Sequence, residues 1–216
     1  MPELPEVETT KTSLLPLLEQ RVHAVQVRQS SLRWPIPDDL HKLVGQKLLN
    51  LTRRSKYILA QFEQDSMLWH LGMSGSLRVL PGDTPLRAHD HVDISLDNGR
   101  LLRFNDPRRF GSLLWQEPGS VHPLLQGLGP EPLAEDFDGA YLFARSRGRS
   151  APVKTFLMDQ RIVVGVGNIY AAESLFMAGI NPLREAGKVS RERYQRLATA
   201  VKDILGHAIT RGGTTL

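Results

Sequence analysis

The 216-residue sequence contains no cysteine. This absence excludes disulfide bonds, thiolate-based zinc or iron–sulfur sites, and a thiol nucleophile. The sequence also lacks any apolar run near the roughly 18 residues of a membrane-spanning helix. Its N-terminus carries acids where a secretory signal would carry Lys or Arg. We therefore expect a soluble, cytoplasmic protein that has no membrane partner.

Charge and composition place the chain among ordinary globular proteins. Lys and Arg number 27 against 23 Asp and Glu, a net charge of +4, and 41% of the residues are hydrophobic. A chain of this length can bury a core without disulfides, as one large domain or two small ones. The modest basic excess is compatible with a polyanionic partner but does not specify one.

The first half of the chain has the pattern of an antiparallel β fold opened by a helix. Leu4, Val7 and Leu14 have helical spacing within residues 2–20. Strands are expected where apolar and polar residues alternate, at 22–27, 47–51, 57–62 and 92–96. An Asn-Gly pair at 98–99, before the apolar run 101–104, predicts a hairpin. Because no long helices interleave, an antiparallel sandwich or barrel is favoured.

The second half is helical. Residues 116–132 are rich in Gly and Pro and are typical of a linker. Helices are expected at 141–145, 153–159, 168–178 and 191–210, the last two ended by glycines. The predicted fold class is therefore α+β, with a β-rich domain at residues 1–130 and an all-helical domain at 131–216.

The N-terminus supports two interpretations. Prolines and acids are favoured in the first turn of any helix, so the segment can be purely structural. Alternatively, removal of Met1 exposes the amine of Pro2. The reference pKa of an α-amine is about 7.7–8.0, well below that of Lys, so a terminal amine is a usable nucleophile near neutral pH. Attack of this amine on a sugar C1′ would give an iminium intermediate. Glu3 and Glu6 would then share a helix face as proton donor and orienting group.

The opening Met-Pro-Glu-Leu-Pro-Glu-Val-Glu-Thr resembles the start of the formamidopyrimidine-DNA glycosylases, bacterial base-excision repair enzymes. Similar blocks follow in order along the whole chain: RRSKY at 53–57, HLGMSG at 70–75, HDHVD at 89–93, DPRRFG at 106–111, LGPEPL at 128–133, VGVGNIY at 164–170 and GGTTL at 212–216. Leu4 and Val7 favour the oxidised-purine branch over the related endonuclease VIII branch.

The resemblance implies a DNA glycosylase with abasic-site lyase activity. Its partner would be double-stranded DNA containing oxidised purines (8-oxoguanine, formamidopyrimidines) or abasic sites, bound by a monomer between a β-sandwich and a helix-two-turn-helix domain. Pro2 would attack C1′, Glu3 would relay protons, and Lys56 would assist elimination. A surface lysine in a basic strand is the structural alternative for Lys56.

The resemblance also implies residues that contact DNA. Met73, Arg108 and Phe110 match wedge residues, which fill the gap left by a flipped base; core packing is the alternative for the two apolar ones. His89 matches a DNA-contacting histidine. With His91 it would share one face of a strand, and the pair therefore also admits a metal site, although no third ligand has a telling spacing.

Further contacts are implied in the helical half. Arg149 and Lys154 lie in a basic run that matches a phosphate-binding region, with a solvated surface as the alternative. The segment 165–168 also suggests a nucleotide-binding loop, but Tyr170 stands where that fingerprint requires Gly or Ala. In the family this segment begins a helix whose N-terminus, with Asn168, holds a DNA phosphate.

The sequence departs from the family at its C-terminal end. The family continues past the GGTTL block into a four-cysteine zinc finger, and here neither cysteines nor that finger are present. We therefore expect no cofactor, with Schiff-base and β-elimination chemistry retained and with base recognition and complete β,δ-elimination impaired. A catalytically impaired DNA-binding remnant and a small nucleotide-binding enzyme remain as alternatives.

Overall fold

The structure is a computed structural model that describes residues 1–213, so the last three residues of the GGTTL block lie outside it. The chain forms two compact units. The first contains Met1–Pro2 and Val7–Leu125, and the second contains Glu3–Glu6 and Gln126–Leu216. The first turn of the N-terminal helix is therefore part of the second unit, although the sequence around it belongs to the first.

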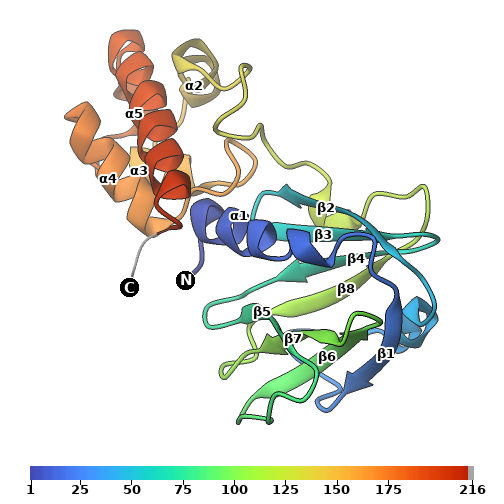
Figure 1. The fold of residues 1–216 in the computed structure, drawn as a ribbon. Helices are drawn as coiled ribbons and strands as arrows, with labels where there is room; N and C mark the ends of the chain where they lie inside the picture. The colour runs from blue at the N-terminus through green and yellow to red at the C-terminus, as the bar shows by residue number, and fades with distance from the viewer. Residues whose placement is uncertain (214–216) are drawn as a thin grey trace. The chain divides into compact units, whose positions relative to one another are not determined.

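The first unit is a sandwich of two four-stranded antiparallel sheets, seen as two layers in Figure 1. One sheet has the order β1 (Val22–Val27), β6 (Asp90–Leu96), β7 (Arg100–Asn105), β5 (Ser76–Pro81). The other has the order β2 (Leu48–Arg54), β3 (Tyr57–Phe62), β4 (Ser66–His70), β8 (Ser112–Gln116). Both sheets bury apolar side chains in one core, which includes Ile58 and Ile94. The predicted antiparallel sandwich is confirmed.

The N-terminal helix is shorter than the sequence pattern predicts. Helix α1 spans Leu4–Ser13 and is followed by a single 3₁₀ turn, Leu15–Leu17. The reason is Pro16, which has no N–H to donate and restricts the backbone of the residue before it. Val7 and Leu14 still reach the core of the sandwich, as their spacing indicated.

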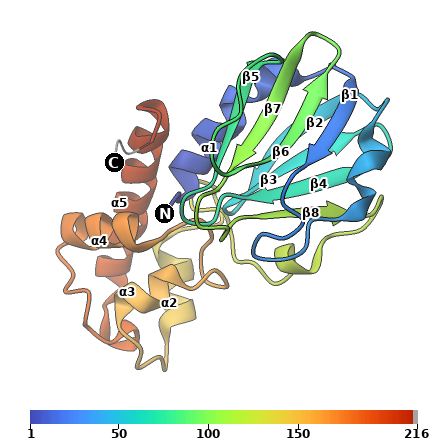
Figure 2. The ribbon, with the colours of Figure 1, turned by 90° about the horizontal axis from the view of Figure 1, so that it is seen from below.

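The second unit is built from four α-helices among the described residues. These are α2 (Gly139–Ser146), α3 (Val153–Met158), α4 (Asn168–Ala178) and α5 (Arg191–Thr210). Figure 2 shows α4 and α5 side by side, and a separate apolar core fills the space among the helices. The predicted bounds of α4 and α5 are confirmed. Within residues 1–213 no helix is long and apolar enough to cross a membrane.

A crossover connection lies over the sheet that contains β7. Strands β5 and β6 both pair with β7 in antiparallel fashion, so the connecting residues 82–89 must run back along the length of β7. Arg103, on β7, donates to the backbone carbonyls of Thr84 (3.2 Å) and Pro85 (3.0 Å) and is only 2% exposed. The guanidinium of Arg103 therefore holds the connection against the sheet.

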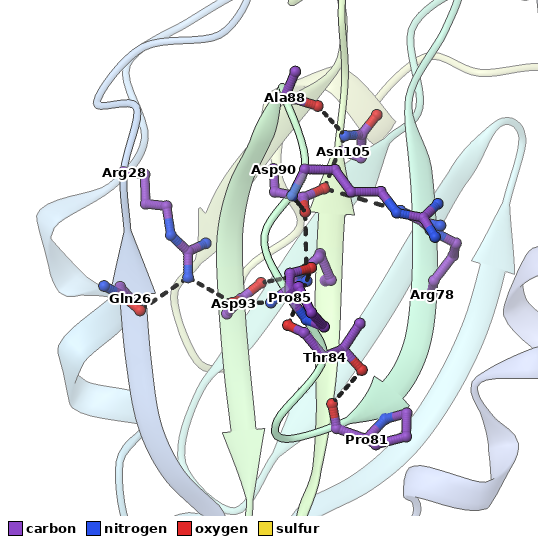
Figure 3. Close-up of polar contacts among 12 residues, drawn as sticks. Gln26, Arg28, Arg78, Pro81, Thr84, Pro85, Ala88, Asp90, Asp93 and Asn105 are labelled. Carbon is purple, nitrogen blue, oxygen red and sulfur yellow. Dashed lines mark hydrogen bonds and ion pairs between the residues drawn. The ribbon is translucent and has the colours of Figure 1, made fainter.

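Two carboxylates from β6 balance this buried cation, in the network drawn in Figure 3. Asp93 forms a bidentate pair with Arg103 at 2.8 and 2.9 Å and also pairs with Arg28, while Asp90 lies 3.4 Å from Arg103. Burial alone would raise the pKa of Asp93, but the hydrogen-bonded Arg103 and Arg28 outweigh it and hold the pKa below its ordinary value. Asp93 is therefore charged at neutral pH.

Replacing Arg103 with Met should lower the free energy of unfolding by about 3–5 kcal/mol, because Asp90 and Asp93 would lose the buried cation that lies between them. Urea denaturation at pH 7 measures this difference. Arg100→Met, at an exposed position of the same strand, should stay within about 0.5 kcal/mol of the parent chain. An equally small effect of Arg103→Met would show that the network does not stabilise the sheet.

Candidate active site

The carboxylate of Glu3 is buried against the N-terminus of α4. It accepts hydrogen bonds from the backbone amides of Gly167 (2.7 Å), Ile169 (2.9 Å) and Tyr170 (3.3 Å), and Glu3 is 2% exposed. These amides have no partner within the helix, and a negative charge at this end complements the helix dipole. Glu3 therefore joins the N-terminal segment to the helical unit.

Glu6 fixes the peptide bond between Pro2 and Glu3. One of its carboxylate oxygens accepts the backbone N–H of Glu3 at 2.9 Å, and the other accepts the hydroxyl of Tyr170 at 2.7 Å. The first contact is one half of a capping box, in which the third helical residue reaches back to the residue before the helix. The N–H of Glu3 belongs to the peptide plane that begins at Pro2, so this contact also orients Pro2.

The glycines of the 164–170 block make room for this N-terminal segment. A Cβ on Gly167 would lie 2.5 Å from Cδ of Glu3, and a Cβ on Gly165 would lie 2.6 Å from Cδ1 of Leu4. The amide of Leu4 also donates to the Gly165 carbonyl at 3.0 Å. Because the chain itself occupies the loop, the geometry gives no support to the nucleotide-binding interpretation.

Two details of the sequence expectation are corrected here. Glu3 precedes α1 instead of sharing a helix face with Glu6, because it makes the cap of α4. The N-terminus of α4 was expected to hold a DNA phosphate, but the amides of Ile169 and Tyr170 already donate to Glu3. What α4 does present at this end is the exposed side chain of Asn168.

Lys56 lies in the two-residue turn of the β2–β3 hairpin. Ser55 is the first central residue of this turn and has φ +57°, the positive φ that a type II′ turn requires there. For a residue other than Gly, this backbone conformation costs about 1–2 kcal/mol. Arg53 supports the turn, since it donates to the Ser55 carbonyl (2.8 Å) and pairs with Glu8 of α1 (2.8 Å). Lys56 is 8% exposed, so it is not the surface lysine that the sequence alone would favour.

His70, at the end of β4, is held in the neutral form. Burial and the nearby charges of Lys56 and Arg33 lower its pKa from 6.5 to about 4. Its Nδ1 accepts the backbone N–H of Gly72 at 3.0 Å, and its ring lies 4.9 Å from the ring of Tyr57. The neutral imidazole therefore anchors the start of the loop that carries Met73.

A cavity of about 740 Å³ opens beside this loop. It is lined by Met1, Ser31, Leu32, Arg33, His70, Gly72, Met73, Arg108, Arg109 and Phe110. Met73 is 42% exposed and Phe110 is 45% exposed, and the guanidinium of Arg108 lies 4.8 Å from the centre of the Phe110 ring. Neither apolar side chain packs in the core, so the structural alternative for both is wrong.

The two histidines of the 89–93 block differ in burial and hydrogen bonding, although their ring centroids lie 6.3 Å apart. His89 lies in a turn before β6 with φ +71° and is exposed, whereas His91 is buried and donates through Nε2 to the Asp106 carbonyl at 2.8 Å. A register shift between Asp90 and Val92 breaks the alternation that the sequence suggests. Among residues 1–213, no third ligand is placed with this pair to complete a metal site.

The basic run of the helical unit divides into structural and exposed residues. Arg147 stacks 3.9 Å from the centre of the Phe143 ring and donates to the Val189 carbonyl at 2.9 Å. Arg149 is exposed and Lys154 partly buried, so both retain surface available to a polyanion.

Comparison with known proteins agrees with this geometry. The family model for the formamidopyrimidine-DNA glycosylase N-terminal domain matches residues 1–113, and the model for the H2TH domain of the same enzymes matches residues 128–216. The chain belongs to the formamidopyrimidine-DNA glycosylase family. The resemblance stated from the sequence blocks is thereby confirmed.

Similar relatives cover the whole chain. The formamidopyrimidine-DNA glycosylase of Stenotrophomonas maltophilia (strain K279a) is 76% identical over 218 residues, and that of Xanthomonas oryzae pv. oryzae (strain PXO99A) is 67% identical over 219 residues. In each case the match covers 100% of this chain and 81% of the relative.

Solved glycosylase structures match the same extent of the chain. The Lactococcus lactis enzyme bound to abasic-site DNA is 30% identical, with a TM-score of 0.92 over 99% of this chain and 80% of that one. A complex of the wild-type L. lactis enzyme with DNA containing N7-benzyl-Fapy-dG gives a TM-score of 0.93 at 31% identity, over 100% of this chain and 81% of that one.

The glycosylase family binds a zinc ion through four cysteines, and these 216 residues contain no cysteine. Among residues 1–213, moreover, no group of three His, Asp or Glu side chains is arranged to bind a metal ion. The residues present thus do not fit this zinc, and no chemical step below involves it.

Several residues of the candidate site were not singled out from the sequence. Arg33 and His70 line the cavity, and Tyr170 holds Glu6. His70 and Tyr170 lie within the sequence blocks that resemble the family, and this position could have identified them. Arg33 lies in an irregular segment with no such signal.

The lowered pKa of His70 makes a test of its burial possible. Between pH 6.5 and about 4 the unfolded chain binds a proton that the folded chain excludes, so the free energy of unfolding should fall as the pH falls through this range. His70→Asn keeps an acceptor for Gly72 and removes the titration, so its loss of stability should be smaller. Urea denaturation at several pH values, with the exposed His23→Asn as control, measures the difference. Parallel profiles for parent and His70→Asn would contradict the assignment.

Proposed function

We propose that this chain is a base-excision repair glycosylase with abasic-site lyase activity, which removes 8-oxoguanine and formamidopyrimidines from double-stranded DNA in the cytoplasm. In this proposal residues 1–130 carry the catalytic groups and residues 131–216 bind DNA. The observation that carries it is that the N-terminal residue lines the same cavity as Met73, Arg108 and Phe110. Removal of Met1 would leave the amine of Pro2 at the edge of that cavity.

The nucleophile in this proposal is the secondary amine of Pro2. Its nitrogen bonds to C1′ while the N-glycosidic bond breaks, and the base leaves with the bonding electrons and takes up a proton. The new ammonium then loses its proton, and the nitrogen lone pair forms a C=N bond to C1′ as the C1′–O4′ bond breaks and O4′ takes up a proton. The sugar ring is thereby opened to an iminium ion. Glu3 relays protons during this exchange, and Glu6 orients Pro2 through the amide of Glu3.

Lys56 assists the elimination that follows. Removal of a proton from C2′ of the iminium intermediate expels the 3′ phosphate and cleaves the strand. Two observations support this role: Lys56 is buried, and the turn that carries it has a strained backbone at Ser55. Strained backbone conformations cluster at functional sites, where the surrounding structure holds them in place.

The wedge residues lower the free energy of base flipping. Unstacking a base costs a few kcal/mol, and side chains that fill the vacated space offset part of that cost. Met73, Arg108 and Phe110 are suited to this role because they are exposed, partly apolar and presented by loops beside one cavity. Base flipping does not require the protein to recognise the DNA sequence, so loops whose shape fits a distorted duplex are sufficient for it.

The remaining proposed residues hold the DNA backbone. Arg149 and Lys154 contribute positive charge, and Asn168 and His89 contribute exposed polar side chains. Contacts of this kind fix the register of the duplex without reading its sequence, and they weaken as salt concentration rises.

Borohydride trapping on two forms of one chain tests the function. The form lacking Met1 should yield a covalent adduct with a duplex that contains an abasic site, whereas the form retaining Met1 should yield none, because its Pro2 nitrogen is an amide. Intact mass identifies the two forms before the reaction, and an 8-oxoguanine duplex tests base excision in parallel. If the Met1-free form yields no adduct on either duplex while it binds both, the chain is a DNA-binding protein without this activity.

A further inference from the structure

Asp106 is buried where three exposed loops of the sandwich meet. It is 0% exposed and makes five hydrogen bonds with its side chain and backbone. The loops are residues 72–75, which carry Met73; residues 107–111, which carry Arg108 and Phe110; and residues 87–89, which carry His89. Nothing in the proposed chemistry uses Asp106 directly.

The side chain of Asp106 joins the two loops that line the cavity. Oδ1 accepts the hydroxyl of Ser74 at 2.7 Å, and the Ser74 hydroxyl oxygen accepts the backbone N–H of Arg108 at 3.2 Å. Oδ2 accepts the backbone N–H of Gly111 at 2.8 Å. One carboxylate therefore fixes both ends of the segment that carries Arg108 and Phe110, and ties that segment to the Met73 loop.

The backbone of Asp106 joins the third loop. Its N–H donates to the His89 carbonyl at 3.1 Å, and its carbonyl accepts from Nε2 of His91 at 2.8 Å. The same carbonyl accepts the amide of Arg109 at 3.2 Å, which closes the turn that Pro107 begins. The exposed turn with His89 is therefore held at the residue that holds the other two loops.

The backbone around Asp106 is packed too closely for a Cβ at Gly72 or Gly111. A Cβ on Gly111 would lie 2.9 Å from Oδ2 of Asp106, and a Cβ on Gly72 would lie 2.4 Å from the backbone nitrogen of Gly111. The loops thus meet backbone to backbone at one distance. A change in the hydrogen bonds of Asp106 would be transmitted directly to the side chains that the loops present.

We propose that Asp106 is a positioning residue for base flipping: it holds the Met73, Arg108–Phe110 and His89 loops in the one arrangement that matches a distorted duplex. This inference rests on the proposed function. Preorganised loops bind the flipped state without first being ordered, and displacement of such groups by about 1 Å can reduce a rate by about a hundredfold. An aspartate suits the position because two donors face it and each needs an acceptor oxygen.

The test compares rates of borohydride trapping on two DNA substrates. An abasic site in a duplex must be extruded, whereas an abasic site in single-stranded DNA is already accessible. Asp106→Ala should slow trapping on the duplex by about tenfold or more and on the single strand by less than about twofold. Asp106→Asn keeps one acceptor oxygen for the Gly111 amide, so its trapping rate on the duplex should lie between the rates of the parent chain and of Asp106→Ala. Ser74→Ala, which cuts only the link to Arg108, should show a smaller effect in the same direction without unfolding the domain.

Gln46→Ala is the matched control. Gln46 is a buried side chain that holds loops near the Leu48 end of β2, through hydrogen bonds to Lys42, Gln64 and Asp65. Its loss should destabilise the sandwich and leave the ratio of duplex to single-strand rates unchanged. If Asp106→Ala and Ser74→Ala lower both rates equally, Asp106 is only structural and the inference is overturned.

A second measurement separates failure of the inference from failure of the proposed function. The ratio of affinities for a tetrahydrofuran-containing duplex and an undamaged duplex involves no chemistry. If the parent chain forms no adduct with single-stranded DNA, the lyase proposal fails, but this ratio still tests Asp106. Asp106→Ala and Ser74→Ala should lower it, and an unchanged ratio would overturn the inference.

Discussion

The carboxylate of Glu3 is the contact on which the proposed site depends. It lies at the N-terminus of α4 and accepts three backbone hydrogen bonds there. An N-terminus is normally the most mobile part of a domain, and a nucleophile on a mobile segment would be poorly oriented. Burial of Glu3, with Glu6 holding its amide, gives this N-terminus a defined conformation and thereby orients Pro2, the residue that precedes Glu3.

The sandwich uses the same physical strategy at two further places. Arg103 holds the 82–89 crossover through backbone carbonyls. Asp106 holds two loops with its side chain, through the Gly111 amide and the Ser74 hydroxyl, and a third through its own backbone N–H. In each case a buried charged side chain is satisfied by groups from a loop. Exposed residues such as Met73 and Phe110 can then lie on loops and still be well positioned, because the anchors beneath them are rigid.

The sequence predicted the elements whose patterns are local. Strands β1 and β3 alternate, α4 and α5 end at glycines, and the bounds of all four match the structure. Strand β4 was not identified as a separate strand because Met67, Leu68 and Trp69 are all buried, which removes the alternation. The end of α1 was missed because its apolar spacing continues past Pro16, where the helix cannot.

The candidate site was only partly predictable. Pro2, Glu3 and Lys56 came from ordered family blocks, and the family is confirmed, although their roles remain proposals. The bonds from Glu3 to α4 span more than 160 residues of sequence, so no local pattern could reveal them. The irregularity between Asp90 and Val92 depends on the pairing of β6 with β7, and the hydrogen bonds of Asp106 depend on three loops meeting.

The most direct test of the account is to find which nitrogen carries the sugar after borohydride reduction. The Met1-free chain would be trapped on a duplex with an abasic site, digested with nuclease and protease, and mapped by tandem mass spectrometry. The reduced sugar remnant is expected on the Pro2 nitrogen. A remnant on Lys56 or another lysine would contradict it, because the nucleophile would then be a side chain and the orientation of Pro2 by Glu3 and Glu6 would have no role in the reaction.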